Sequence, residues 1–214
     1  MNMADQNQEM TKSFLTTLDS MDETFDWRIL LKNERPLQLR GTLDEVYAQL
    51  SEWNEKGAGI FITVNATNGL GQKTGSINRV RALFADLDGC PLSNIARIPL
   101  TPHLVIETSP KKYHAYWLID GLSLDDFKPL QQTIAAICSS DPVVCDLPRI
   151  MRVPGFYHHK TKPFMSRIIR HETHSIYTAD EVKCALLSQV VGHTSSVAEF
   201  KQPEFDFNKP LSDG

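Results

Sequence analysis

One apolar stretch that ends in two carboxylates decides the fold: Arg81-Ala82-Leu83-Phe84-Ala85-Asp86-Leu87-Asp88-Gly89. Its first part has the composition of a buried β-strand, in which side chains two positions apart point to the same face of the sheet. Asp86 and Asp88 therefore place two negative charges side by side at a strand end. Such a pair is costly unless a cation neutralises it, so the sequence predicts a divalent-metal site here.

The composition is that of an ordinary globular protein. The chain has 214 residues, 41% hydrophobic and 22% charged, with a formal net charge of -4. This length and hydrophobic content are enough for one large core, and they argue against a chain that is disordered throughout. The net charge gives no global attraction to nucleic acid, so such a partner would have to meet a local basic surface. The four cysteines form no CxxC pair and no apolar run reaches transmembrane length, so we expect free thiols in a cytoplasmic protein without a membrane segment.

Apolar periodicity predicts strands and helices interleaved around a single α+β core. Strands are expected at residues 25–31, 37–40, 59–65, 81–88, 104–109, 113–119 and 166–170. Helices are expected after Thr42 and after Thr178, each opened by a capping box, and at residues 124–139. We expect a flexible segment at residues 1–20 with at most a short helix, one domain at residues 21–190, and a linker or disordered tail at residues 191–214.

Basic and polar side chains gather in two further stretches. The glycine-rich loop at residues 66–75 could lay backbone N–H groups against phosphates, or it could be a flexible hairpin connection. The loop at residues 141–160 carries two carboxylates, two arginines, two histidines and a lysine, a mixture that suits a polyphosphate or a nucleic-acid backbone. Either Asp141 or Asp146 could supply a third metal ligand. With His114 on a strand beside two lysines, these are the groups that phosphoryl or nucleotidyl transfer needs.

Two families share the Asp-x-Asp strand. Phe84 to Gly89 resembles the signature of the haloacid-dehalogenase-like phosphatases, but Cys90 follows the glycine, the motif lies far from the start of the chain, and no Gly-Asp-x-x-x-Asp follows. The chain is more similar to the archaeo-eukaryotic primase superfamily, in particular to the RepB-like plasmid and phage primases and primase-polymerases. Three elements stand in that family's order: Asp86-Leu87-Asp88, Ser109-Pro110-Lys111-Lys112-Tyr113-His114-Ala115-Tyr116-Trp117 and Asp146-Leu147-Pro148-Arg149-Ile150-Met151-Arg152-Val153-Pro154-Gly155-Phe156.

This resemblance implies a fold and an activity. The fold would be a primase palm, with an RNA-recognition-like antiparallel sheet packed beside a small αβ unit. The activity would be template-dependent nucleotidyl transfer, which primes or polymerises on single-stranded DNA in plasmid, phage or mobile-element replication. The implied partners are a single-stranded DNA template, rNTPs or dNTPs, and a helicase in trans or in a longer chain.

The resemblance also implies roles for particular residues. Asp86, Asp88 and Asp146 would be catalytic and would bind two Mg²⁺ or Mn²⁺ ions. Nucleotide binding would fall to His114, Lys112, Ser109, Arg149, Arg152, Lys160 and Asn68. Two positions depart from the family's pattern, because Lys112 stands where a small residue is usual and His158 where an asparagine is usual. Both differences concern base or sugar selectivity and leave the metal site alone.

Three other interpretations stay open on the residues alone. A rolling-circle nuclease needs two histidines with one hydrophobic residue between them, whereas His158 and His159 are direct neighbours. A non-catalytic single-strand-binding module could stack bases on Tyr116 and Trp117, although it would have no use for three carboxylates. Structural zinc bound by Cys138, Cys145 and a histidine has no standard spacing, and buried free thiols are the favoured interpretation.

Overall fold

The computed structural model of the protein describes residues 3–71 and 73–192. Its helices are α1 (Met3–Leu18), α2 (Leu43–Glu55), α3 (Leu124–Cys138) and α4 (Ala179–Gly192). Its strands are β1 (Phe25–Leu30), β2 (Leu37–Gly41), β3 (Gly59–Thr63), β4 (Ala66–Thr67), β5 (Ile77–Arg79), β6 (Ala82–Asp86), β7 (Leu104–Ser109), β8 (Lys112–Asp120), β9 (Ile150–Arg152), β10 (Tyr157–His158), β11 (Phe164–Met165), β12 (Arg167–His171) and β13 (Tyr177–Thr178). Within the described ranges, no helix is both long and apolar enough to span a bilayer.

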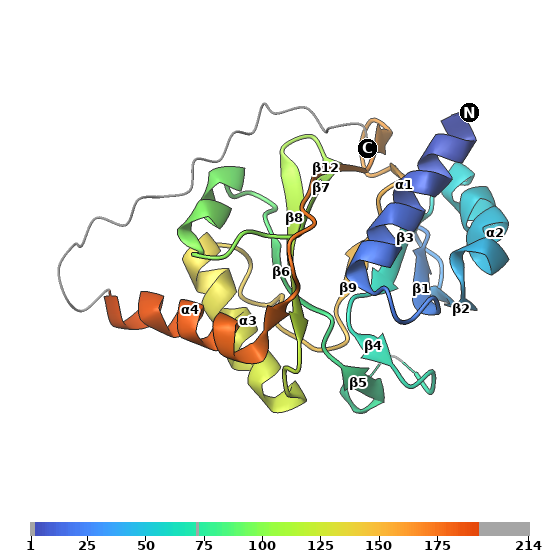
Figure 1. The fold of residues 1–214 in the computed structure, drawn as a ribbon. Coiled ribbons are helices and arrows are strands. Elements are labelled where there is room, and N and C mark those ends of the chain that lie inside the picture. The colour runs from blue at the N-terminus through green and yellow to red at the C-terminus, as the bar shows by residue number, and fades with distance from the viewer. Residues whose placement is uncertain (1–2, 72, 193–214) are drawn as a thin grey trace.

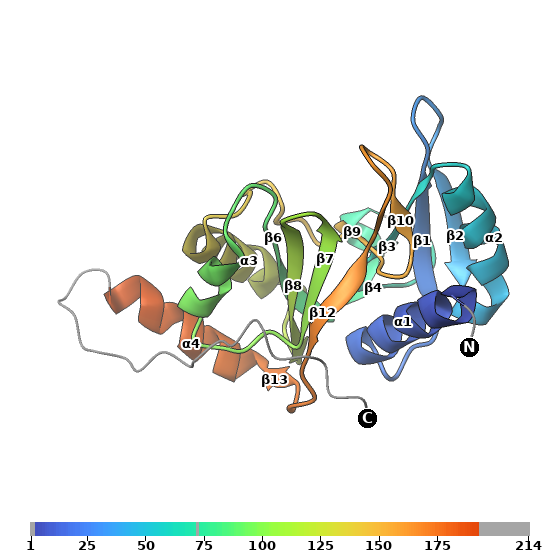
Figure 2. The same cartoon turned by 90° about the horizontal axis from the view of Figure 1, so that it is seen from above.

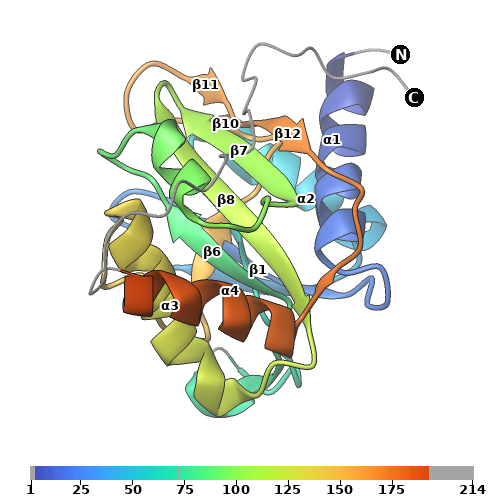
Figure 3. The same ribbon diagram turned by 60° about the vertical axis from the view of Figure 1, so that its left-hand side comes forward.

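The predicted carboxylate strand lies inside a five-stranded, mainly antiparallel sheet. Strand β8 pairs with β6 and β7 along its length and, in parallel, with β13 near its end, while β12 pairs with the outer side of β7. Figure 3 shows β6, β7 and β8 side by side, with α4 lying across one end of the sheet. The strands predicted at residues 104–109 and 113–119 are confirmed and pair as a hairpin, with Lys111 at its turn at a positive φ of 63°.

A second sheet has the strand order β2-β1-β3-β9. Its first three strands come from the N-terminal part of the chain, and β9 joins them from the loop that follows α3. Figure 2 shows the two sheets facing each other across the middle of the molecule, with α3 and α4 outside one and α1 and α2 beside the other. Strand β9 therefore carries the Arg-rich loop to the junction between the two sheets.

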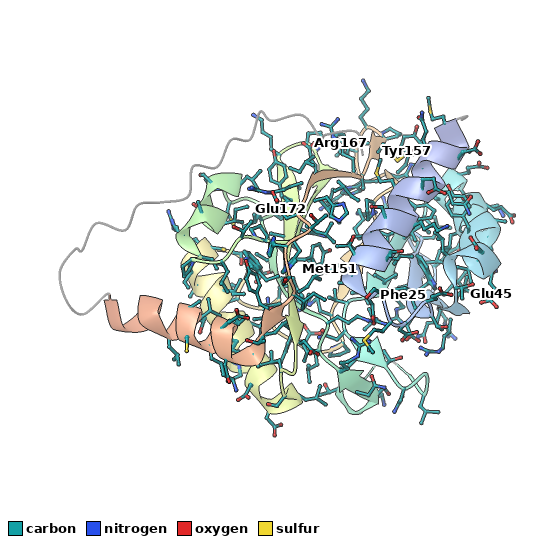
Figure 4. The ribbon with its side chains drawn as sticks, in the orientation of Figure 1. Phe25, Glu45, Met151, Tyr157, Arg167 and Glu172 are labelled. Atoms are coloured by element: carbon teal, nitrogen blue, oxygen red, sulfur yellow. The ribbon has the colours of Figure 1, made fainter. Side chains whose placement is uncertain are left out.

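One cluster of buried apolar side chains extends through both halves of the molecule. Strand β6 contributes almost nothing but buried residues, since Ala82, Leu83 and Phe84 are fully covered. Figure 4 shows Met151 of β9 near the centre of the molecule, and this side chain is 3% exposed. Gln131 of α3 bonds to both the N–H and the C=O of Phe84, which anchors that helix to the central strand.

Several local predictions are confirmed. Thr42 and Glu45 form the reciprocal capping box expected at the start of α2. Thr178 and Glu181 make the matching pair of hydrogen bonds before α4. All four cysteines are free thiols. These features depend on neighbours in the sequence, which is why the sequence alone could identify them.

The N-terminal segment and one aromatic side chain differ from expectation. Residues 3–18 form helix α1, whose Phe14, Leu15 and Leu18 are buried, where we expected a flexible segment with a short helix at most. The apolar stripe of Phe14, Leu15 and Leu18 had indicated a short helix on the core, and the helix extends further toward the N-terminus than this stripe. Tyr157, whose apolar ring favours burial, lies at the upper edge in Figure 4 and is 38% exposed. Of the tail predicted at residues 191–214, the first two residues belong to α4, and residues 193–214 lie outside the described residues.

Candidate active site

The site begins where β6 and β8 lie opposite each other. Asp86, the last residue of β6, pairs in register with His114 of β8, so their side chains share one face of the sheet. The Nε2 atom of His114 lies 3.9 Å from Oδ1 of Asp86, too far for a hydrogen bond. The structure thus brings together a carboxylate and a ring nitrogen that were 28 positions apart in the sequence, with a gap between them.

The second carboxylate faces a lysine. The Nζ atom of Lys112 lies 2.7 Å from Oδ1 of Asp88 and 2.8 Å from Oδ2. Lys112 opens β8 directly after the turn, and the N–H of Leu87 donates to the carbonyl oxygen of Tyr113, which holds the two segments together. An ammonium group therefore occupies the position beside Asp88 in which a metal ion would be expected.

The electrostatics around Asp86 favour a cation. Burial raises the pKa of this carboxyl, and the negative charges of Asp88 and Asp141 raise it further, while Arg149 acts in the opposite direction. A hydrogen bond from the N–H of Asp88 to Oδ1, 3.2 Å long, offsets only part of this cost. Asp141 was one of two candidates for a third carboxylate, and its charge is felt at Asp86.

His114 is buried and neutral. Burial lowers its pKa to about 3, and the positive charge of Arg152 on the neighbouring sheet acts in the same direction. A neutral imidazole at physiological pH is a hydrogen-bond donor through one nitrogen and an acceptor through the other. His114 can therefore donate to a phosphate oxygen, although it carries no charge of its own.

Arg152 is a half-buried cation without an acidic partner in the described part of the chain. Its guanidinium lies over the ring of Phe61, 4.5 Å from the centroid, and its Nη1 atom is buried with no hydrogen-bond partner. Burial lowers its pKa to about 10, so it stays charged at neutral pH. A side chain on residue 59 would collide with Phe61 and crowd Arg152, which explains the glycine there. A half-buried, unpaired guanidinium favours an anionic ligand.

Asp146 and Arg149 form an ion pair in the loop before β9. The loop is held in place because the N–H of Val64 donates to the carbonyl of Arg149, and the side chain of Asn65 donates to the carbonyl of Leu147. Among the residues that the structure describes, no three His, Cys, Asp or Glu side chains are grouped closely enough to hold a metal ion. In this structure Asp146 pairs with Arg149, and the charge of Arg149 in turn acts on Asp86.

Of the remaining predicted residues, some lie near the site and one lies elsewhere. The charges of Arg152, Lys112 and Lys160 all lower the pKa of His158, after burial, so these cations share one region. Ser109 is buried at the end of β7, beside the turn into β8. Asn68 belongs to the hairpin of β4 and β5, which Figure 1 shows at the bottom of the view, whereas the turn between β7 and β8 is at the top.

The structure argues against a single-strand-binding module that stacks bases on Tyr116 and Trp117. Tyr116 is 0% exposed and Trp117 is 1% exposed, so neither ring can stack on a base at the surface. The aromatic ring under the guanidinium of Arg152 is Phe61, a residue that the sequence indicated only as part of an apolar strand. Its neighbours in β3, Ile60 and Ile62, face the core, and this alternation is the signal that could have set Phe61 apart.

The donors present suit a small, hard divalent ion. Mg²⁺ is usually held by one or two carboxylates together with waters and substrate phosphates, and it does not need a complete protein cage. Asp86 and Asp88 supply two carboxylates, and the pKa of Asp86 is raised by burial first and by the charges of Asp88 and Asp141 after it, a cost that a bound cation would offset. The residues therefore fit such an ion.

Comparison with a protein family agrees with this geometry. A profile of the RepB DNA-primase N-terminal domain matches residues 65–190, which include Asp86 and Asp88, His114, and the segment from Asp146 to Arg152. The chain belongs to the RepB DNA-primase family. The chain therefore contains a DNA-primase domain. The comparison with curated protein sequences gave no match.

Solved structures share the fold of this RepB-family domain. The primase-polymerase domain of cyanophage S-2L, described as an AEP domain, superposes with a TM-score of 0.71 at 20% identity, covering 84% of this chain and 97% of the phage chain. The catalytic domain of primase RepB′, solved in complex with initiator DNA, gives a TM-score of 0.63 at 18% identity, with 88% and 95% covered. The predicted α+β primase fold is confirmed.

Proposed function

We propose that this domain catalyses template-dependent nucleotidyl transfer on single-stranded DNA at the end of β6. Asp86 and Asp88 hold the divalent ions, with Asp146 or Asp141 completing the site. Two bound Mg²⁺ or Mn²⁺ ions would supply Lewis-acid chemistry, activating the attacking hydroxyl and neutralising the triphosphate and the pyrophosphate leaving group.

The chain's own residues bind and orient the nucleotide. His114 donates from its neutral ring to a phosphate oxygen, because its Nε2 faces the gap beside Asp86. Arg152 supplies the positive charge, and its guanidinium has no competing carboxylate within the described ranges. Lys112, Lys160 and Arg149 add exposed or half-buried cations around the same region. Such preorganised groups stabilise charge that develops on the phosphates during transfer.

One observation carries this proposal: a carboxylate and a guanidinium, Asp86 and Arg152, both act on His114 and neither forms an ion pair within the described residues. Within residues 3–71 and 73–192, Asp86 has no lysine or arginine at ion-pair distance, and His114, 3.9 Å away, is neutral. Arg152 lacks an anion, and its charge is felt at His114. A metal-bound nucleoside triphosphate carries the charges that both groups lack. A structural ion pair would have joined them directly.

The test is nucleotide incorporation by the variant with both Asp86→Ala and Asp88→Ala. Labelled rNTPs and dNTPs are supplied with a single-stranded template and Mg²⁺ or Mn²⁺, with and without a primer. We expect incorporation to fall by about a thousandfold or more, since the double variant cannot hold the ions. Asp120→Asn, at the exposed far end of β8, is the matched control and should retain activity. Undiminished synthesis by the double variant, with its melting temperature unchanged, would refute the proposal.

A further inference from the structure

Tyr116 stands two residues after His114 on the same face of β8 and is entirely buried. Its hydroxyl lies 3.3 Å from the Nδ1 atom of His114. The phenol ring is held edge-on by Phe14 of α1, with 5.7 Å between the ring centroids. Trp117 is also buried, but its indole N–H bonds to the carbonyl of Leu100, away from the site. The hydroxyl of Tyr116 is therefore the buried polar group that contacts the imidazole at Nδ1, whereas Nε2 faces Asp86.

The hydrogen bonds available to Tyr116 and His114 determine which ring nitrogen of His114 carries the proton. A buried O–H group without an acceptor is costly, and among the described residues Nδ1 of His114 is the acceptor within reach of the Tyr116 hydroxyl. If Nδ1 carried the proton, it would donate to the phenol oxygen, and the hydroxyl proton would have no acceptor. The tautomer that satisfies both groups has Tyr116 donating to Nδ1 and the ring proton on Nε2.

Nε2 is the atom that faces Asp86 across a gap of 3.9 Å. In the assigned tautomer this atom is a donor, which suits a phosphate oxygen. In the other tautomer it would present a lone pair beside two carboxylates, which suits a metal ion. The choice of tautomer therefore separates two chemical roles for the same histidine.

We infer that Tyr116 is a positioning residue that holds His114 in its Nε2–H tautomer, so that the ring binds the triphosphate of the incoming nucleotide and does not ligate metal. This inference rests on the proposed function for its nucleotide, but the tautomer itself can be measured without any reaction. Tyr116 touches neither nucleotide nor metal and acts only through His114.

The first experiment measures the tautomer by ¹⁵N NMR of the full chain. His114→Gln identifies the ring's signals by their absence. In the wild type we expect the signature of a protonated Nε2 and a bare Nδ1. In Tyr116→Phe, which keeps the buried ring against Phe14, we expect a mixture of tautomers. Tyr177→Phe is the matched control, because it removes a hydroxyl that donates to the carbonyl of Thr101 at 3.0 Å, away from the site. A wild-type ring protonated at Nδ1, or an unchanged spectrum in Tyr116→Phe, would overturn the inference.

The second experiment measures steady-state incorporation. Tyr116→Phe should raise the KM for nucleotide by about tenfold and leave kcat within about twofold, because the lost interaction is with bound triphosphate. His114→Gln, whose amide N–H₂ lies where Nε2–H was, should retain more nucleotide affinity than His114→Asn, whose amide mimics Nδ1. Equal KM values for wild type and Tyr116→Phe would contradict the inference. If the wild type incorporates nothing, the proposed function fails, and the NMR result still decides the role of Tyr116.

Discussion

The two ends of strand β6 carry charges in opposite circumstances. Arg81, which precedes the strand, is 2% exposed at its side chain and pairs with Asp19 at 2.5 Å and with Asp22 at 3.1 Å. It also lies over the ring of Phe25 at 4.7 Å. Asp86, at the other end, has no partner at ion-pair distance other than the neutral His114. One end is a closed ion-pair network, and the other is an open site.

The pKa shifts of the two carboxylates express this difference. Burial alone would raise the pKa of Asp19, but hydrogen bonds and charge from Arg81 and Arg79 outweigh it, and the net shift is downward. Burial raises the pKa of Asp86, neighbouring carboxylates add to the effect, and the net shift is upward. Of these two carboxylates, Asp19 is paired within the chain and stabilises the fold, whereas Asp86 is left without a charged partner at the proposed site.

The largest expected effect comes from breaking the closed end. Arg81→Met should destabilise the protein by about 3–5 kcal/mol, because Asp19 remains buried without its main partner. Urea unfolding measures the loss. Asp86→Asn is the contrasting variant at the open end, and it should abolish incorporation with little or no loss of stability. Equal destabilisation by both variants would erase the distinction between the two ends.

The pH dependence of stability should follow the closed end. The folded state holds Asp19 at a pKa below its ordinary 3.8. Its stabilisation is therefore complete above that ordinary value and is lost as the pH falls through the lowered pKa of the folded state. Asp19→Asn should be less stable than wild type at pH 7 by about 2 kcal/mol. The gap should close in acid, as chemical unfolding at successive pH values would reveal. A gap that stays constant down to the lowest pH tested would contradict the pairing.

At the open end, Lys112 is the cation that stands closest to a carboxylate. Lys112→Ser should strengthen Mn²⁺ binding in the absence of nucleotide by about three- to tenfold, since a competing charge beside Asp88 is removed. It should also raise the KM for nucleotide, because the triphosphate loses a cation. Electron paramagnetic resonance of free Mn²⁺ measures the first effect. Lys111→Ser, one residue earlier in the turn, is the control. Weaker Mn²⁺ binding by Lys112→Ser would contradict this role.

The smallest effect belongs to an exposed pair. Lys56 and Glu52 lie 2.6 Å apart on the surface of α2, both more than half exposed. Glu52→Gln should leave the unfolding free energy almost unchanged, because water and salt screen such pairs. Thermal unfolding at low and high salt measures the change. A loss comparable to that of Arg81→Met would mean that burial is not what separates the two cases.

Much of the local structure could be predicted from the sequence, and the relation between distant segments could not. The capping boxes, the β7–β8 hairpin and the burial of β6 follow from short-range patterns. Helix α1 was underestimated, because its apolar stripe acquires meaning only when Phe14 packs on Tyr116. The pairing of β3 with β9, which brings Arg152 onto Phe61, joins residues some ninety positions apart and leaves no periodic signal.

The sequence by itself determined which groups are available: two carboxylates on one strand end, a histidine on the next hairpin and an Arg-rich loop. Spacing along a strand fixes which side chains share a face, so the placement of Asp86 and Asp88 side by side could be predicted from the sequence. Only the tertiary structure decided which charges are paired. Arg81 finds Asp19 and is satisfied, while Asp86, His114 and Arg152 meet at the junction of two sheets without neutralising one another. The energy of a buried charge depends on its neighbours in space, and these come from segments that only the fold brings together.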